Sequence, residues 1–354
     1  MIPVTLAGVR ILALMLVACS SSPAPAPAPR QTPLPPPAVT PTSARELADA
    51  VALRDGGILA RTTAGGLVRF GATLHVQTEV AGRAIAIAVD GDRAFAGLAD
   101  GTIEELDPTT LAPTPVARVT GEPLWLSVRG PELVVFAHPG AAKAYKVEIK
   151  RLDTGAARSI AIPNDRSEAM EIAAPATFAR DATAVWFGID AGEWGGWVGR
   201  VDLAAGTLTH VVHEDDVYGF LAVGDRMLAH GGSVHMGITD GYVAELAGKA
   251  SRNLWKAEWN YEPQTPPPVP VVRMLVEGDH YLVLLWNELY RVDAAFKTWT
   301  RVAKLEARVH PGRPDAVGSY PATTAMLKLG DRLVIATVRD GLFELRGDQL
   351  VKVE

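Results

Sequence analysis

The chain has 354 residues, of which 48% are hydrophobic and 21% charged, and its formal net charge is -6 at pH 7. This hydrophobic content is enough for a folded core, and the acidic balance argues against nucleic acid as a partner. After the first 20 residues no segment is long and apolar enough to predict a transmembrane helix.

The amino-terminal residues have the pattern of an export signal. Arg10 is the only charged residue among the first ten, and an uninterrupted apolar run follows at residues 11–18. This run is shorter than the roughly 20 residues that a membrane-spanning helix needs. A basic residue, a short apolar core and small residues before a cleavage point predict a secretory signal peptide.

The end of this segment reads Leu16-Val17-Ala18-Cys19, and Cys19 is the only cysteine in the chain. The motif resembles the lipobox of bacterial lipoproteins. The resemblance implies cleavage before Cys19 and acylation of that residue with palmitate-like chains, several of which make a durable anchor. A serine at position 20 implies, within that family, an outer-membrane destination on the periplasmic or the surface side. The alternative is an ordinary cleaved signal with a chance cysteine.

Proline dominates the segment that follows. Pro23, Pro25, Pro27 and Pro29 alternate with alanine, and further prolines extend to position 41. Proline fixes φ and removes backbone donors, so we expect an extended, semi-rigid tether. The sequence therefore predicts a signal peptide at 1–18, a lipidated cysteine with its linker at 19–45, and a folded domain at 46–354.

The folded domain contains an internal repeat. Three clear copies, at residues 91–106, 224–246 and 330–345, have Gly-Asp-Arg, an apolar run, an Asp-Gly pair and a final Glu-Leu. A degenerate copy covers 278–293, and weaker ones lie near Asp55, Gly130 and Asp181. About seven copies at spacings of roughly 35 to 55 residues bracket the period of propeller blades.

The local pattern favours an all-β fold. Asp-Gly between apolar runs predicts hairpins with type I′ turns, which require positive φ at both central residues. Strands such as 133–136 are apolar throughout, as in sheets covered on both faces. We therefore expect a β-propeller of seven four-stranded blades rather than a sandwich, with six or eight blades as alternatives.

The segment 333–345, which reads Leu-Val-Ile-Ala-Thr before Asp340-Gly341 and Phe-Glu-Leu after it, resembles the superfamily of quinoprotein-like and sensor-regulator propellers. In layout alone the chain is similar to barrel-assembly propeller lipoproteins. The Asp-x-x-Thr-Gly and tryptophan signature of that family is not regular here, and Asp153-Thr154-Gly155 is its only close echo. Such resemblance implies a fold and not a function.

The predicted connections differ in length. With the strands of a blade labelled A to D outward from the channel, the A–B and C–D turns are short. Antiparallel pairing places the B–C and D–A connections on the opposite face, and these include the long segments 189–196, 230–240, 163–171, 259–270 and 306–321. Long loops are often functional, so we expect the binding surface there.

These loops contain aromatic and basic residues that suit contact with a protein, a glycan or a small ligand. The alternative is that the tryptophans only pack the loops against the blades. The candidate partner-binding residues are Trp194, Trp197, His230, His235, Trp259, Tyr261, His310, Arg313 and Tyr320.

The sequence provides no convincing catalytic set. It contains no phosphate-binding loop, nucleophile elbow or zinc-helix motif. On a strand His210 and His213 would point to opposite faces, and His230 with His235 has no evident third ligand, so we assign no metal, cofactor or catalytic residue.

Two hypotheses follow. The first is a membrane-anchored, non-catalytic envelope module that binds a protein or cell-wall glycan. The alternative is a propeller enzyme, such as a metal-dependent, lactonase-like hydrolase, with its site at the channel mouth. An enzyme should bring several titratable side chains together there, whereas a binding module should show aromatic and scattered polar groups.

Overall fold

The computed structural model describes residues 45–140, 145–162, 174–190, 195–211, 215–235, 238–258, 264–305 and 323–353. All of them belong to one compact unit, Ala44–Glu354. Cys19, the predicted signal peptide and almost all of the predicted linker lie outside the described residues. Within the described part, no helix has the length and apolar character needed to cross a membrane.

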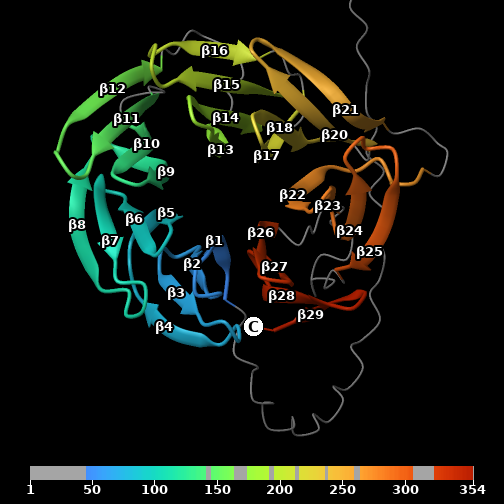
Figure 1. Cartoon of the computed structure of the whole chain (residues 1–354), viewed down its shortest axis with the longest axis horizontal. Coiled ribbons are helices and arrows are strands. Elements are labelled where there is room, and N and C mark those ends of the chain that lie inside the picture. Colours follow the sequence, from blue (N-terminus) through green and yellow to red (C-terminus); the bar gives the residue numbers. More distant parts are fainter. Residues whose placement is uncertain are drawn as a thin grey trace, which may run out of the picture. The chain divides into compact units, whose positions relative to one another are not determined.

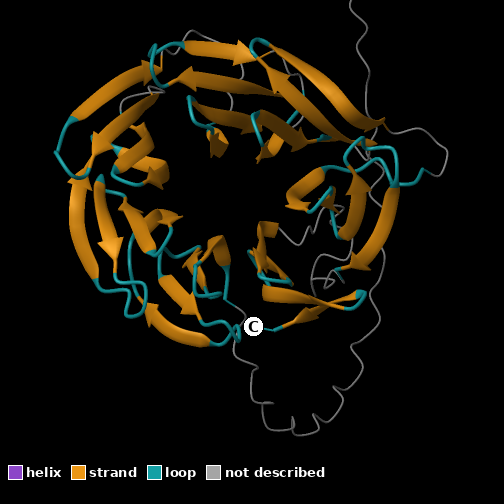
Figure 2. Cartoon of the chain, in the orientation of Figure 1, coloured by secondary structure: helices purple, strands orange, loops and turns teal. Residues whose placement is uncertain are grey.

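The described residues form antiparallel sheets in which consecutive strands pair, so the all-β expectation is confirmed (Figure 2). The first sheet comprises β1 (Leu47–Ala52), β2 (Ile58–Thr62), β3 (Leu67–Phe70) and β4 (Val76–Val80). The second comprises β5 (Ala84–Asp90), β6 (Arg93–Leu98), β7 (Thr102–Leu106) and β8 (Pro113–Arg118). The third comprises β9 (Glu122–Arg129), β10 (Glu132–His138), β11 (Tyr145–Arg151) and β12 (Ala157–Ile162). The fourth comprises β13 (Pro175–Arg180), β14 (Ala184–Asp190), β15 (Gly196–Asp202) and β16 (Leu208–Val211).

The fifth sheet has an additional short strand. It comprises β17 (Val217–Val223), β18 (Arg226–Gly231), β19 (Val234–His235), β20 (Ile238–Ala247) and β21 (Ala250–Glu258). The main path runs β17, β18, β20 and β21, while β19 pairs with the beginning of β20.

The last strands join into one sheet of eight. One half comprises β22 (Val271–Glu277), β23 (His280–Leu285), β24 (Glu288–Asp293) and β25 (Trp299–Lys304). The other half comprises β26 (Thr323–Leu329), β27 (Arg332–Thr337), β28 (Gly341–Arg346) and β29 (Gln349–Lys352). A single parallel pairing, Lys304 with Gln349, links the two meanders.

The first strand of each meander lies innermost, and the following strands lie progressively farther from the common centre (Figure 1). The hydrophobic clusters lie between consecutive meanders rather than within one. In one cluster Phe136 of β10 packs with Phe187 of β14, and in another Leu228 of β18 packs with Val283 of β23. Each sheet is therefore covered on both faces, which explains its continuous apolar strands.

The first and last meanders pack directly on each other. Ile58 and Phe70 share a cluster with Val334 and Leu342, and the guanidinium of Arg332 donates a hydrogen bond to the carbonyl oxygen of Ala72. In the described residues no strand is exchanged between these two meanders. The ring closes through side-chain packing, not through a shared sheet.

The predicted Gly-Asp turns are confirmed as the connections from first to second strands. Gly91, Gly224, Gly278 and Gly330 have φ of 61° to 62°, the left-handed region that glycine adopts without penalty. A glycine at the first position of a two-residue hairpin loop is the preference of type II′ turns.

The prediction of type I′ turns at Asp-Gly was wrong. At Asp100-Gly101 and Asp340-Gly341 only the glycines have positive φ, and three residues separate the paired strands. Asp240-Gly241 is not a turn at all, because it lies inside β20. A Cβ on Gly241 would lie 2.1 Å from the carbonyl oxygen of Val269, so this glycine allows a close backbone approach.

Candidate functional site

Most of the predicted partner-binding residues lie outside the described residues. These are Trp194, Trp259, Tyr261, His310, Arg313 and Tyr320, and the lipid-attachment candidate Cys19 does too. His235 is described only in its backbone, which pairs with Ile238 in the β19–β20 hairpin.

His230 was predicted in a loop, and that placement was wrong. It lies in β18 and is only 2% exposed. Its Nδ1 lies 3.0 Å from the carbonyl oxygen of Val271, and burial lowers the pKa of His230 to about 3. A carbonyl oxygen only accepts, so the neutral ring carries its proton on Nδ1. Gly219 makes room for the ring, since a Cβ there would lie 2.5 Å from Nε2.

Trp197 was also predicted in a loop, but it lies in β15 and is 8% exposed. Its ring stacks on His210 at 4.6 Å between centroids and contacts the edge of Phe187 at 5.4 Å. The tryptophan therefore belongs to the core between the third and fourth sheets.

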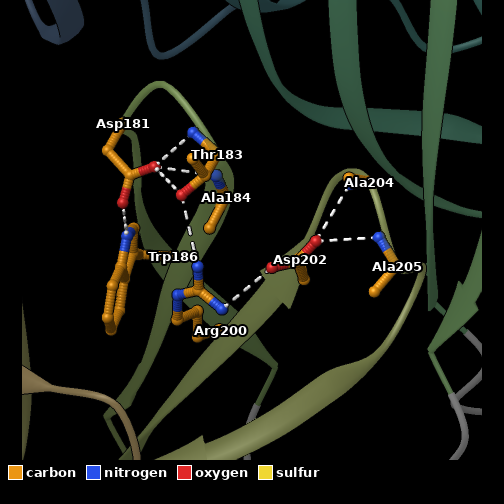
Figure 3. Close-up of polar contacts among 8 residues, drawn as sticks. All are labelled: Asp181, Thr183, Ala184, Trp186, Arg200, Asp202, Ala204 and Ala205. Carbon is orange, nitrogen blue, oxygen red and sulfur yellow. Dashed lines mark hydrogen bonds and ion pairs between the residues drawn. The ribbon is translucent and has the colours of Figure 1, made fainter.

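The short-turn end of the fourth sheet is closed by its own hydrogen bonds (Figure 3). Asp181 accepts from the backbone N–H of Thr183 (2.6 Å) and from Nε1 of Trp186 (2.6 Å). Asp202 accepts from the backbone N–H groups of Ala204 and Ala205 at 2.9 Å and 2.8 Å. The pKa of Asp202 is lowered, mainly by the Ala205 hydrogen bond. Both carboxylates therefore stabilise their own turns.

The opposite end carries a groove of about 580 Å³, here called the outer groove. It lies between the segment that leads into β22 and the turn that joins β23 to β24. At this end the last strand of one meander connects to the first strand of the next, and the second strand of each meander connects to its third. Its lining includes Gln264, Pro267, Trp286, Asn287, Glu288 and Tyr290.

Polar groups are fixed along the outer groove. The hydroxyl of Tyr290 donates to Glu288 Oε2 at 2.7 Å, and burial together with this carboxylate raises the pKa of Tyr290. The other oxygen of Glu288 lies 3.4 Å from Arg301 and 3.6 Å from Lys304. The groove therefore presents an aromatic wall beside an anchored ion-pair cluster.

A second hollow, the channel cavity, lies between the innermost strands and measures about 540 Å³. Sequence reasoning named only one of its residues, His230. Most of its lining residues are apolar, although the surface exposed to the cavity is mainly polar, and the only charged side chains that line it among the described residues are Asp49, Arg61 and Arg273.

Every innermost strand has a β-bulge at its second or third position, near the end where the chain enters from the preceding meander. The pairing register skips one residue in each case: Ala48, Ile85, Leu124, Ala176, Tyr218, Val272 and Thr324. A bulge leaves the extra residue outside the ladder. These bulges form a ring at the outer-groove end of the channel.

Arg273 donates hydrogen bonds to the carbonyl oxygens of three of these bulge residues. Its guanidinium donates to the carbonyl oxygens of Tyr218 (3.0 Å), Val272 (2.6 Å) and Thr324 (3.2 Å and 3.0 Å). All three acceptors are bulge residues, and they come from three neighbouring meanders. Arg273 thus ties the innermost strands β17, β22 and β26 together.

Asp49 and Arg61 are directly opposite each other in the β1–β2 ladder. Burial raises the pKa of Asp49 to about 6, although the charges of Arg61 and Arg273 and a 2.8 Å hydrogen bond from Ala50 N–H oppose the rise. Burial also lowers the pKa of Arg61. The carboxylate therefore lies in the field of two arginines, one from its own meander and one from the sixth meander.

The described part of the chain contains no group of three His, Cys, Asp or Glu side chains placed to hold a metal ion. Within the same residues, no hydrogen bond links the side chains of Asp49, Arg61, His230 and Arg273 to one another. The polar side chains of the channel cavity are therefore scattered among apolar lining residues.

No model of a known protein family matches the chain, and no curated protein matches it in sequence. Solved structures are similar in fold. The β-propeller domain of Cps50 (Swd1) from Myceliophteria thermophila has a TM-score of 0.56 at 10% identity, over 87% of this chain and 97% of that one. Hydrazine synthase from Kuenenia stuttgartiensis has a TM-score of 0.60 at 12% identity, over 88% and 99%. The computationally designed Ika8 protein has a TM-score of 0.53 at 12% identity, over 87% of each chain.

At these identities the likeness shows the fold alone, and that fold is a β-propeller. The propeller prediction is therefore confirmed at the level of architecture.

Proposed function

We propose that this protein is a membrane-anchored envelope lipoprotein whose seven-bladed β-propeller binds a protein or cell-wall glycan. The outer groove is the observation that carries the binding role. It is a hollow of about 580 Å³ on the end of the propeller where the long connections emerge. Sites for small or extended ligands are concave and combine aromatic walls with a few fixed polar groups.

The contrast between the two ends supports this choice of face. At the short-turn end, the carboxylates of Asp181 and Asp202 are engaged by the hydrogen bonds of their own turns. At the other end, Trp286, Tyr290 and Glu288 line a hollow. Aromatic residues next to charged groups are typical of recognition surfaces.

The blade number of seven rests on the meanders. Five sheets of four or five strands are separate, and the sheet of eight consists of two four-stranded meanders joined by one residue pair. Counting each meander as a blade gives seven. The lipid anchor rests on the lipobox-like sequence that ends at Cys19.

The role can be tested by affinity capture of the lipidated protein from its own envelope. The outer-groove variants are Tyr290→Phe, which removes one hydroxyl, and Trp286→Gly, which suits the positive φ of 48° at that position. The control is Thr154→Ala in a short turn at the other end. The expected result is loss of the captured partner in the groove variants and retention in the control, with a cooperative thermal unfolding transition in every variant to show that each one is folded. Equal capture by all variants would contradict the assigned face.

A further inference from the structure

The channel cavity is a second hollow, separate from the outer groove. Its charges do not balance. Arg61 and Arg273 contribute two positive charges, Asp49 at most one negative charge, and His230 is neutral in its buried position. In a protein with a formal net charge of -6, the cavity is therefore an isolated positive centre. Arg61 and Arg273 are half-buried, and charges partly withdrawn from water are normally paired, so one more anion would fit.

Donor groups remain for that anion. Arg273 has five N–H donors, and its four hydrogen bonds to carbonyl oxygens leave one N–H on Nη2. Arg61 makes no hydrogen bond within the described residues, and its Nε is buried without a partner. A carboxylate has two oxygens that can each accept more than one hydrogen bond, which matches this supply.

Two aromatic residues on one side of the cavity offer contact to an apolar body. Trp125 of β9 and Phe178 of β13 stack with 5.9 Å between ring centroids. Both residues line the cavity while packing against the core between the third and fourth sheets. Ile85, Leu124 and Met274 continue the apolar wall. The volume of about 540 Å³ lies within the range of small-molecule sites, roughly 300–1,000 Å³.

We propose that the channel cavity binds a small monocarboxylate with a flat apolar body, whose carboxylate lies between Arg61 and Arg273. The body of this ligand packs along the shelf formed by Trp125 and Phe178. A phosphate would pair with the positive charge of the arginines but would make no contact with the apolar shelf. A neutral aromatic molecule would leave the two arginines unpaired.

The test uses 4-fluorobenzoate, observed by ¹⁹F NMR and by calorimetry, with the full-length protein in matched detergent. Saturable binding is expected, together with weaker binding of acetate and of the neutral isostere 4-fluorobenzamide. Arg61→Gln should weaken binding by at least about tenfold, because a charge-assisted hydrogen bond is lost. Arg61 makes no hydrogen bond that supports the fold, so this variant should unfold at the wild-type temperature. Arg61→Lys should restore part of the affinity.

The matched control is Arg339→Gln, which removes an exposed arginine away from the cavity and should leave the affinity unchanged. Phe178→Leu should weaken the binding of 4-fluorobenzoate but not that of acetate. The proposal is overturned if 4-fluorobenzoate does not bind, if Arg61→Gln binds it as the wild type does, or if inorganic phosphate binds more tightly. None of these results bears on the outer groove, which is tested by partner capture.

Discussion

The guanidinium of Arg273 donates two hydrogen bonds, from Nε at 3.2 Å and Nη2 at 3.0 Å, to the carbonyl oxygen of Thr324 on the neighbouring innermost strand. Thr324 is the bulge residue of β26, so its carbonyl oxygen lies outside the β ladder. The guanidinium of Arg273 thus supplies the hydrogen-bond donors that the carbonyl oxygen of Thr324 lacks within the β ladder. Arg273 therefore both links neighbouring innermost strands and contributes a positive charge to the channel cavity.

Replacing Arg273 should therefore destabilise the fold. In Arg273→Met the carbonyl oxygens of Tyr218 and Thr324 lose their donors, and a buried unsatisfied group costs about 1–3 kcal/mol. We expect the free energy of unfolding in urea to fall by about 2 kcal/mol or more. Arg61→Met, which loses no hydrogen bond, is the control and should change it much less. Equal effects would mean that the bridge to the bulge residues does not stabilise the ring.

Gly241 should not tolerate a side chain. The Cβ of alanine would lie 2.1 Å from the backbone oxygen of Val269, and backbone cannot move aside as a flexible side chain can. Gly241→Ala should lower the free energy of unfolding by about 2–4 kcal/mol. At Gly82 the nearest atom to an added Cβ is 3.2 Å away, so Gly82→Ala serves as the control. A wild-type melting temperature for Gly241→Ala would refute the close approach.

The raised pKa of Asp49 makes stability depend on pH in a defined direction. Its folded pKa of about 6 exceeds the ordinary value of 3.8, so the folded state binds more protons between these values. Asp49 therefore lowers stability as pH rises from about 4 to 6. Asp49→Asn should raise the free energy of unfolding at pH 7.5 by about 3 kcal/mol, and by much less at pH 4.

His230 has the opposite effect on the pH dependence of stability. Its folded pKa of about 3 lies below 6.5, so the unfolded state binds the proton first and stability falls as pH drops from about 6.5 toward 3. Asp49→Asn removes the opposing contribution and should steepen this acid destabilisation. Urea titrations of both proteins at several pH values measure it. Parallel pH profiles for wild type and variant would contradict the account of Asp49.

Several parts of this structure were predictable because they depend on local chemistry. The Gly-Asp turns at Gly91 and Gly330 follow from the need for positive φ, and strands such as 133–136 are apolar because sheets cover them on both sides. The end with the long connections follows from antiparallel pairing alone.

The misplaced residues have identifiable causes. His230 and Trp197 were both assigned to long loops, and a glycine pair lies beside each of them: Gly231-Gly232 and Gly195-Gly196. In the structure two of these glycines lie in strands that other backbone approaches closely: a Cβ on Gly231 would lie 1.9 Å from Asp216 O, and one on Gly196 2.3 Å from Ile189 O. A glycine that permits close packing has the same sequence signal as one that permits a turn.

The channel cavity was not predictable, because its parts have no common sequence pattern. The bulge residues include alanine, leucine, tyrosine and threonine, since a bulge is defined by pairing and not by side chain. Asp49 and Arg273 meet only because the ring closes between the first and last meanders. Such proximity depends on the tertiary fold.

The predicted anchor is tested by Cys19→Ala. The lipobox-like motif predicts that this variant leaves the membrane fraction, because a proline-rich tether has no membrane affinity of its own. Fractionation followed by immunoblotting measures the change, with Ser22→Ala as a control that should stay membrane-bound. Retention of Cys19→Ala in the membrane fraction would refute the lipoprotein assignment.

The central claim is that the outer-groove end of the propeller is the partner-binding face, and site-specific photo-crosslinking in living cells tests it most directly. A photoreactive amino acid placed at Asn287 in the outer groove should give a discrete crosslinked band, which mass spectrometry can identify. The same group at Thr154, in a turn at the opposite end, should give none. Crosslinking from Thr154 but not from Asn287 would contradict the account.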